Sequence, residues 1–395
     1  MSRYIQTLSH PVIARLSLIQ LISYFGTWFS QVAIFSLLVE LHAGALVISL
    51  TAAMAMLPAV VLAPVIGIAV DRIPFKKLMG TLLAIEIIAT LGFMLIDSLS
   101  LVWLLMGLIF IRSAASSMLF SAEMSLFPKI IEGEMLKNTN EIHSIIWSFT
   151  YAAGMAVGGL VTYRFGYHAA FMTDAVLYSI ALSILLGLKL SLTLPQHAHS
   201  HWQMFIDGFY YLKSRKKTIH LILLHASLGL TSFDALVTLL ADYEYKTLIA
   251  VPLAIGWINA VRAIALMIGP FFIGKWINNQ NLHYFFILEG VAIIAWSLTQ
   301  HNFYWALIAL FSVGFFTSTL WSQTYLMLQQ ETDKAYLGRI ISYNDMFFML
   351  SNIVTALFIG YAYEWGFSLR AITVTLGIGF LITAVYYLWI RRKYL

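Results

Sequence analysis

Twelve apolar stretches follow one another along the chain, and each is long enough to cross a lipid bilayer. A transmembrane helix needs about 20 predominantly apolar residues. The stretches cover residues 14–39, 46–70, 78–97, 99–122, 139–162, 168–190, 218–241, 249–274, 282–300, 303–326, 338–362 and 369–390. They lack the alternation of a transmembrane β-strand, and helices satisfy their own backbone hydrogen bonds in lipid. The pattern predicts an all-α polytopic membrane protein with twelve transmembrane helices.

The composition supports a chain whose surface faces lipid. Only 10% of the residues are charged and 61% are hydrophobic, whereas soluble domains carry about 25% charged residues. The sequence contains no P-loop, no metal-ligand cluster and no nucleophile–base arrangement. We therefore expect no enzyme activity, no ATP hydrolysis and no cofactor. A receptor would need a sizeable ligand or signalling domain, and the longest stretch between spans is 191–217.

The distribution of Lys and Arg predicts the orientation in the membrane. Positive residues prefer the cytoplasmic loops. With a cytoplasmic N-terminus, 18 of the 23 Lys and Arg residues fall on the cytoplasmic side. Both termini are therefore expected in the cytoplasm, and the first span is expected to be retained. The net charge of +5 follows from this bias and does not indicate nucleic-acid binding.

The segment 191–217 divides the chain into two parts with six spans each. Its second part, from Trp202, has an amphipathic pattern that predicts a helix lying at the membrane surface. Its histidines, His197, His199 and His201, are read as polar residues of a loop and not as a metal site. The expected organisation is an N-terminal bundle (1–190), a cytoplasmic linker (191–217) and a C-terminal bundle (218–395).

A weak internal repeat supports the two halves. Residues 67–77 and 269–276 each combine a Gly-containing helix end with a short basic loop. Glu86 and Glu289 follow these loops at similar distances, each partway along a third span of its half. Two parallel repeats with a binding site between them near the bilayer midplane are typical of secondary transporters.

The first of these loops resembles a known signature. Gly67-Ile-Ala-Val-Asp71-Arg72-Ile-Pro-Phe-Lys76-Lys77 is similar to the loop between the second and third spans of the major facilitator superfamily. The resemblance implies that these residues form a cytoplasmic gate. Two further residues are assigned to the gate: Glu123, expected to pair with Arg72 or Lys76, and Asp345, expected near the Asp71 loop.

Other stretches resemble the drug and siderophore efflux branch of that superfamily, which contains enterobactin and macrolide exporters. Gly154-Met155-Ala156-Val157-Gly158-Gly159 is similar to the fifth-span signature of antiporters, although Met155 stands where that signature has Pro. The segments 122–129, 171–175 and 337–339 also resemble the branch, although Glu123 stands where the branch often has Arg. The resemblance implies efflux.

Ionisable residues within the spans are costly in lipid, so each is a functional candidate. Asp234 and Arg112 are the first candidates for proton coupling, and Glu86 and Glu289 are further ones. Asp234 is also expected to form an ion pair with Arg262, because an unpaired buried Arg is not tolerated. Asp174 is interpreted as a structural residue.

Aromatic and polar residues on the spans expected at the centre are candidates for substrate binding. Tyr and Trp also occur at membrane interfaces, so part of this set could belong there instead. The candidates are Tyr24, Trp28, Gln31, Trp147, Tyr151, His225, Asn259, Arg262, Trp321 and Tyr325.

Together these features predict a secondary transporter that exports an amphipathic small molecule, a drug or a siderophore, by proton antiport. The expected location is the bacterial cytoplasmic (inner) membrane, and the expected partners are the substrate, protons and membrane lipid, with the protein as a monomer. Two alternatives remain: an importer of a siderophore or nutrient, and a lysophospholipid translocase.

Overall fold

Helices provide all the regular secondary structure in the residues that the computed structural model describes, which are 2–188, 201–333 and 336–395. In chain order they are α1 (Ser2–Leu8), α2 (Pro11–Glu40), α3 (Ala45–Val61), α4 (Ala63–Arg72), α5 (Phe75–Gly92), η1 (Phe93–Leu95), η2 (Leu99–Leu101), α6 (Val102–Ile130), α7 (Gly133–Leu186), α8 (His201–Ser214), α9 (Lys216–Ala226), η3 (Ser227–Thr231), α10 (Asp234–Leu240), η4 (Ala241–Tyr245), α11 (Val251–Ile273), α12 (Leu282–Thr299), α13 (Phe303–Glu331), α14 (Leu337–Glu364) and α15 (Leu369–Tyr394). The all-α prediction is confirmed for these residues.

Ten helices in the described ranges are long and apolar enough to cross a membrane, and Ala45–Val61 is a shorter apolar helix. One of the ten, α7, has 54 residues and contains Gly166 with φ 80° and ψ 168°. This non-helical backbone lies between the two spans expected at 139–162 and 168–190. Glycine adopts a positive φ without a steric penalty, which explains its position at this break.

Two other expected spans are interrupted, each for a local reason. The span expected at 46–70 is divided between α3 and α4 at Leu62, and α4 has a proline in its first turn. The span expected at 218–241 changes to a 3-10 turn, η3, before α10 begins. Such a turn leaves backbone carbonyls without helical partners, and one of them, at Thr231, takes part in the candidate site below.

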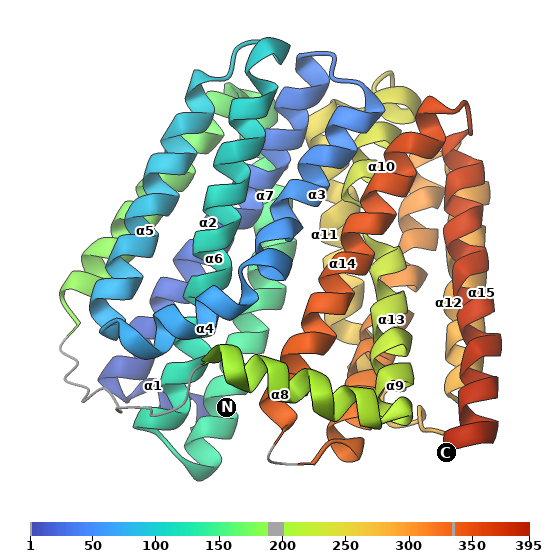
Figure 1. Cartoon of the computed structure of the whole chain (residues 1–395). Coiled ribbons are helices and arrows are strands. Elements are labelled where there is room, and N and C mark those ends of the chain that lie inside the picture. Colours follow the sequence, from blue (N-terminus) through green and yellow to red (C-terminus); the bar gives the residue numbers. More distant parts are fainter. Residues whose placement is uncertain (1, 189–200, 334–335) are drawn as a thin grey trace.

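Both chain termini and α8 lie at the same end of the helix assembly, which we name the terminal face (Figure 1). The opposite end is the far face. The helices of the first half of the chain, in blue to green, lie beside those of the second half, in yellow to red, and α8 lies across the terminal face. Helix α8 lies within the segment where the sequence predicts an amphipathic helix, and its position at a membrane surface stays a prediction. His197 and His199 lie outside the described residues, and no group of three metal-ligating side chains occurs within them.

The two halves touch most closely near the far face. A Cβ on Gly159 of α7 would lie 2.6 Å from the Pro252 carbonyl oxygen of α11, and a Cβ on Gly256 would lie 2.6 Å from the Met155 carbonyl oxygen. Helices α3 and α14 also approach closely, because a Cβ on Gly360 of α14 would lie 2.6 Å from the Ser49 Cβ of α3. Small residues permit such close backbone approach.

Candidate functional site

A polar cluster lies between the two halves, where α2 and α7 meet α10 and α11. The Gln31 side chain donates a hydrogen bond to Asp234 Oδ1 at 3.3 Å. The Tyr151 hydroxyl donates to Asn259 Oδ1 at 3.4 Å. Gln31, Asp234 and Arg262 are half-buried, whereas Tyr151 and Asn259 are buried. We name these five residues the central cluster, and all five were candidates from the sequence.

The expected ion pair between Asp234 and Arg262 is absent from the central cluster. Arg262 instead donates a hydrogen bond to the Thr231 carbonyl oxygen at 2.6 Å, and its guanidinium lies 5.0 Å from the centre of the Phe233 ring. The prediction was wrong because the η3 turn presents a free carbonyl to the guanidinium, which pattern reading along the chain does not reveal. Asp234 and Arg262 therefore remain separate charges in one cluster.

Aromatic rings border the central cluster in the first half of the chain. The Trp28 ring lies 4.3 Å from the Tyr151 ring and 5.8 Å from the Trp147 ring. Further towards the terminal face, the Tyr24 ring packs edge-on against His143 at 5.8 Å. Stacked and edge-on rings supply a broad apolar surface with specific geometry.

A second aromatic group lies in the other half. His225 packs against Trp321 at 4.4 Å and Tyr325 at 5.5 Å between ring centres, and Phe348, which the sequence did not single out, completes the group. His225 is fully buried, and its Nδ1 lies 2.8 Å from the Thr324 hydroxyl. The structure brings these candidates together, but it places them on helices α9, α13 and α14, apart from Trp28 and Tyr151.

Arg112 is the centre of a buried charged cluster within the first half. Its guanidinium contacts Asp174 Oδ2 at 2.7 Å and Glu86 Oε2 at 3.4 Å, and it donates to the Tyr178 hydroxyl at 3.3 Å. Ser30 also donates to Asp174. All three charged side chains are at most 7% exposed. The sequence indicated Arg112 and both acids separately, but not that they form one cluster.

Glu123 does not pair with Arg72 or Lys76, contrary to the prediction. Its Oε2 accepts a hydrogen bond from Gln20 at 2.8 Å and from the Tyr24 hydroxyl at 3.4 Å, and the residue is 2% exposed. Two turns of α6 separate Glu123 from the helix end at Ile130, and its side chain is buried against α2 instead of reaching the basic loop. Lys76 instead donates to the carbonyl oxygens of Leu186 and Leu188.

The remaining ionisable candidates have simpler surroundings. Glu289 is fully buried and accepts a hydrogen bond from the Thr317 hydroxyl at 2.7 Å. Asp345 accepts a bond from the neighbouring Asn344 at 3.3 Å. Arg72 and Lys77 are exposed. Gly67 and Asp71 lie on α4, but their surroundings fall outside what the structure describes, so the contact expected between Asp345 and the Asp71 loop stays a prediction.

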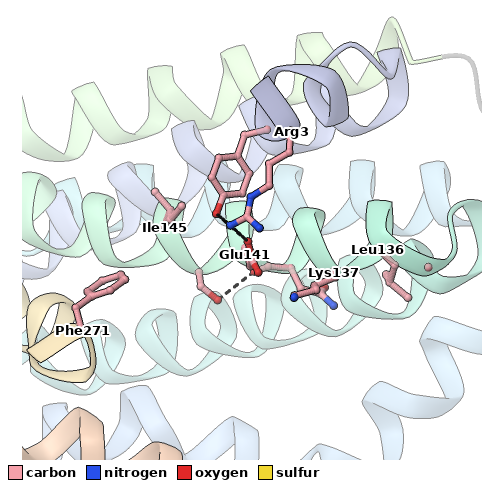
Figure 2. Close-up of a pocket in the computed structure, with 10 residues that line it drawn as sticks. Arg3, Leu136, Lys137, Glu141, Ile145 and Phe271 are labelled. Atoms are coloured by element: carbon pink, nitrogen blue, oxygen red, sulfur yellow. Dashed lines mark hydrogen bonds and ion pairs between the residues drawn. The ribbon is translucent and has the colours of Figure 1, made fainter. Parts of the chain in front are cut away.

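A cavity of about 800 Å³ opens at the terminal face between α1, α7 and α11. Figure 2 shows Arg3 directed at Glu141 of α7, with Phe271 of α11 on the other side of the cavity. Arg3 lies 3.1 Å from Glu141, and Tyr4 donates to the same carboxylate oxygen at 2.8 Å. The hydrogen bond to Tyr4 and the charge of Glu141 raise the pKa of Arg3. The cavity is lined mainly by α1 and α7 of the first half, and Phe271 of α11 is the residue that the second half contributes.

Replacing Glu141 with Gln is expected to release α1 from α7 without changing the stability of the whole protein. The ion pair is partly exposed, with 49% of the Arg3 side chain and 32% of the Glu141 side chain accessible, and ion pairs open to solvent contribute little to the free energy of unfolding. Hydrogen–deuterium exchange should therefore become faster in Ser2–Leu8 while the unfolding temperature stays unchanged. Glu134→Gln, which removes a carboxylate from the same helix, is the control. Equal exchange of α1 in both variants would contradict a role for the Glu141 contact.

Apolar helices, buried charges and a polar and aromatic cluster between two halves define a multi-pass membrane transport protein. The chain belongs to the Major Facilitator Superfamily, whose family model matches residues 16–253. Members of this family are transporters and not enzymes, and no catalytic family is indicated.

The relatives in sequence are also transporters. The chain is 25% identical over 337 residues to macrolide efflux protein A of Streptococcus pyogenes, an alignment that covers 82% of each chain. It is 28% identical over 200 residues to the MFS-type transporter YfiS of Bacillus subtilis (strain 168). That second alignment covers 49% of this chain and about half, 47%, of YfiS.

Solved structures show the same fold at low identity. The nucleoside transporter NupG matches with a TM-score of 0.76 at 16% identity, covering 98% of this chain and all of that one. A peptide transporter of the POT family matches with a TM-score of 0.74 at 12% identity, covering 96% of this chain and 94% of that one. These likenesses concern the fold alone.

Proposed function

We propose that the protein exports an amphipathic small molecule, a drug or a siderophore, in exchange for protons. The observation that carries the proposal is the central cluster, where Asp234 and Arg262 form no direct ion pair with each other and lie beside the rings of Trp28 and Tyr151. A carboxylate, a guanidinium and flat aromatic surfaces suit a ligand with both polar and apolar parts. The name of the Streptococcus pyogenes relative, a macrolide efflux protein, supports export and makes a macrolide the first compound to test.

Alternating access would operate across this cluster. We propose twelve crossings in two six-helix halves, with α7 contributing two of them on either side of Gly166, because 54 residues of helix would span about 80 Å against the roughly 30 Å of a bilayer core. The positively charged loops support a cytoplasmic terminal face, and the bacterial relatives support a bacterial membrane. The open cavity at that face would admit substrate, and the contacts at the far face would separate during release.

Asp234 is proposed as the residue at which protons and substrate meet. A proton on Asp234 removes its charge, and burial in a low-dielectric site makes that change energetically large. Gln31 of the other half donates to Asp234, so the charge state of Asp234 also alters a contact between the halves. A ligand or proton that favours one arrangement of the halves shifts the equilibrium between them.

Transport in proteoliposomes tests this function. The purified protein is reconstituted, a proton gradient is imposed, and movement of a radiolabelled macrolide is followed. Accumulation on the side that corresponds to export, abolished by a protonophore, is the expected result. Accumulation in the opposite direction would indicate an importer. Movement of labelled lysophospholipid between leaflets without movement of the macrolide would favour the translocase.

Asp234→Asn is expected to abolish transport driven by a proton gradient while the protein remains folded. Asparagine keeps an acceptor for Gln31 but cannot bind and release a proton. The matched control is Asp242→Asn near the far face, where Asp242 pairs with Lys246 one turn away. Gradient-driven transport in the Asp234 variant at the level of the Asp242 variant would remove Asp234 from the coupling mechanism.

A further inference from the structure

A second group of polar residues lines a small, partly enclosed cavity inside the first half of the chain. The cavity lies between α2, α5, α6 and α7 and is separate from the central cluster. Its lining is Ser23, Tyr24, Thr27, Glu86, Ser116, Leu119, Glu123 and Tyr178. The volume accessible to the centre of a water molecule is about 10 Å³, which is enough for one water.

Several buried polar atoms at this cavity lack a hydrogen-bond partner in the described residues, although Glu86 forms an ion pair with Arg112. The Ser23 hydroxyl forms no hydrogen bond with the described residues, and neither carboxylate oxygen of Glu86 accepts one. Arg112 Nε lies 3.4 Å from Glu86 Oε2. Buried polar atoms are normally hydrogen-bonded, and the exceptions often mark a water. One water in the cavity would meet the Ser23 hydroxyl and the carboxyl groups that line it.

The charges around the cavity are unbalanced. The titratable and charged groups that face it or its carboxyl groups are Tyr24 of α2, Glu86 of α5, Arg112 and Glu123 of α6, and His143, Asp174 and Tyr178 of α7. Two of the three carboxyl groups, those of Glu86 and Asp174, contact the one guanidinium. Glu123 has no ion pair among the described residues and is held by Gln20 and Tyr24. Two carboxylates on one cavity repel each other, and a proton shared between them removes the repulsion.

We propose that Glu86 and Glu123, bridged by one water in this cavity, form a proton-binding site additional to Asp234. A proton leaves the Glu123 carboxyl for the water, and the water passes one of its own protons to Glu86. Glu123 lies seven residues before the end of α6, about 10 Å from the terminal face along the helix, so it is the entry side of the path. This inference rests on the proton exchange proposed above.

The site is connected to the central cluster by α2. Protonation of Glu86 leaves Asp174 as the one carboxylate in contact with Arg112 among the described residues, and Asp174 accepts a hydrogen bond from Ser30. The next residue, Gln31, donates to Asp234 in the other half. A change in the Arg112–Asp174 contact therefore reaches Asp234 through two adjacent residues of one helix. A proton at this additional site would lie away from the substrate, and α2 would link it to Asp234.

The first test is infrared spectroscopy of the purified full chain in lipid nanodiscs. The stretching band of protonated carboxyl groups is followed as the pH is raised. We expect Glu123→Gln and Glu86→Gln each to remove part of the titrating band, and Glu123→Asp to retain it. Ser23→Val fills the cavity and leaves both glutamates in place. It should therefore alter the titration of the carboxyl band if one water bridges the two carboxyl groups. A titrating band unchanged in Glu123→Gln and Glu86→Gln overturns the proposal, whatever the substrate is.

The second test separates this site from the transport function. In proteoliposomes, Glu123→Gln should lower gradient-driven accumulation of the labelled macrolide by about tenfold or more but leave its exchange across the membrane near the wild-type rate. Asp234→Asn should impair both. If the wild-type protein moves no macrolide, the proposed substrate fails while the infrared result still decides the proton site. If Glu123→Gln and Glu86→Gln both accumulate the macrolide as fully as the wild type, the proposed proton site is wrong while the proposed export function stands.

Discussion

Replacing Arg112 with Met is expected to be the most destabilising single substitution in the charged cluster. Arg112 is at most 7% exposed and is the only cation in contact with Glu86 and Asp174 among the described residues. Removing one partner of a buried ion pair leaves an uncompensated charge and costs about 3–5 kcal/mol. Unfolding in detergent, followed by circular dichroism during titration with sodium dodecyl sulfate, measures the loss.

Two further variants make this prediction specific. The triple substitution Arg112→Met, Glu86→Gln and Asp174→Asn removes every charge together and should recover much of the lost stability, because no charge is left unpaired. Arg164→Met removes an exposed arginine and should change little. If Arg112→Met is as stable as Arg164→Met, the cluster does not hold α5, α6 and α7 together.

Gly159→Val is expected to open the far face and thereby disrupt the transport cycle. A Cβ on Gly159 would lie 2.6 Å from the Pro252 carbonyl oxygen and 3.2 Å from Gly256 Cα, both backbone atoms of α11 that cannot rotate away. Overpacking of this kind costs about 1–3 kcal/mol. A cost of that size, borne only by the state closed at the far face, shifts the equilibrium between states by roughly 5- to 150-fold.

Spin-label distances measure this shift directly, since the chain contains no cysteine and labels attach only where one is introduced. Labels at Tyr163→Cys and Leu248→Cys flank the Gly159 contact on exposed positions of the two halves. Their separation should increase in Gly159→Val. Gly107→Val is the matched control, because a Cβ there meets no atom within 4 Å. If the distance is unchanged, or increases equally in the control, then the contact between Gly159 and α11 does not exclude a larger side chain.

The sequence was sufficient for the properties that depend on each segment alone. Hydropathy is a local quantity, so the apolar helices, the amphipathic α8 and the list of buried ionisable residues followed from it. The signature at residues 67–77 indicated the superfamily that the family model then identified. The candidates of the central cluster also followed, because polar side chains within apolar spans are rare.

Only the tertiary structure decided which of these residues meet. Arg112 and Asp174 are 62 positions apart, and Gln31 and Asp234 are 203 apart. Whether such pairs form depends on the rotation of each helix about its axis and on its packing against neighbours, neither of which a hydropathy pattern contains. For that reason the sequence predicted a partner for Asp234 on α11 and for Glu123 in the basic loop. In the structure, Asp234 accepts a hydrogen bond from Gln31, and Arg262 donates one to the Thr231 carbonyl oxygen of η3. Glu123 lines the same cavity as Glu86.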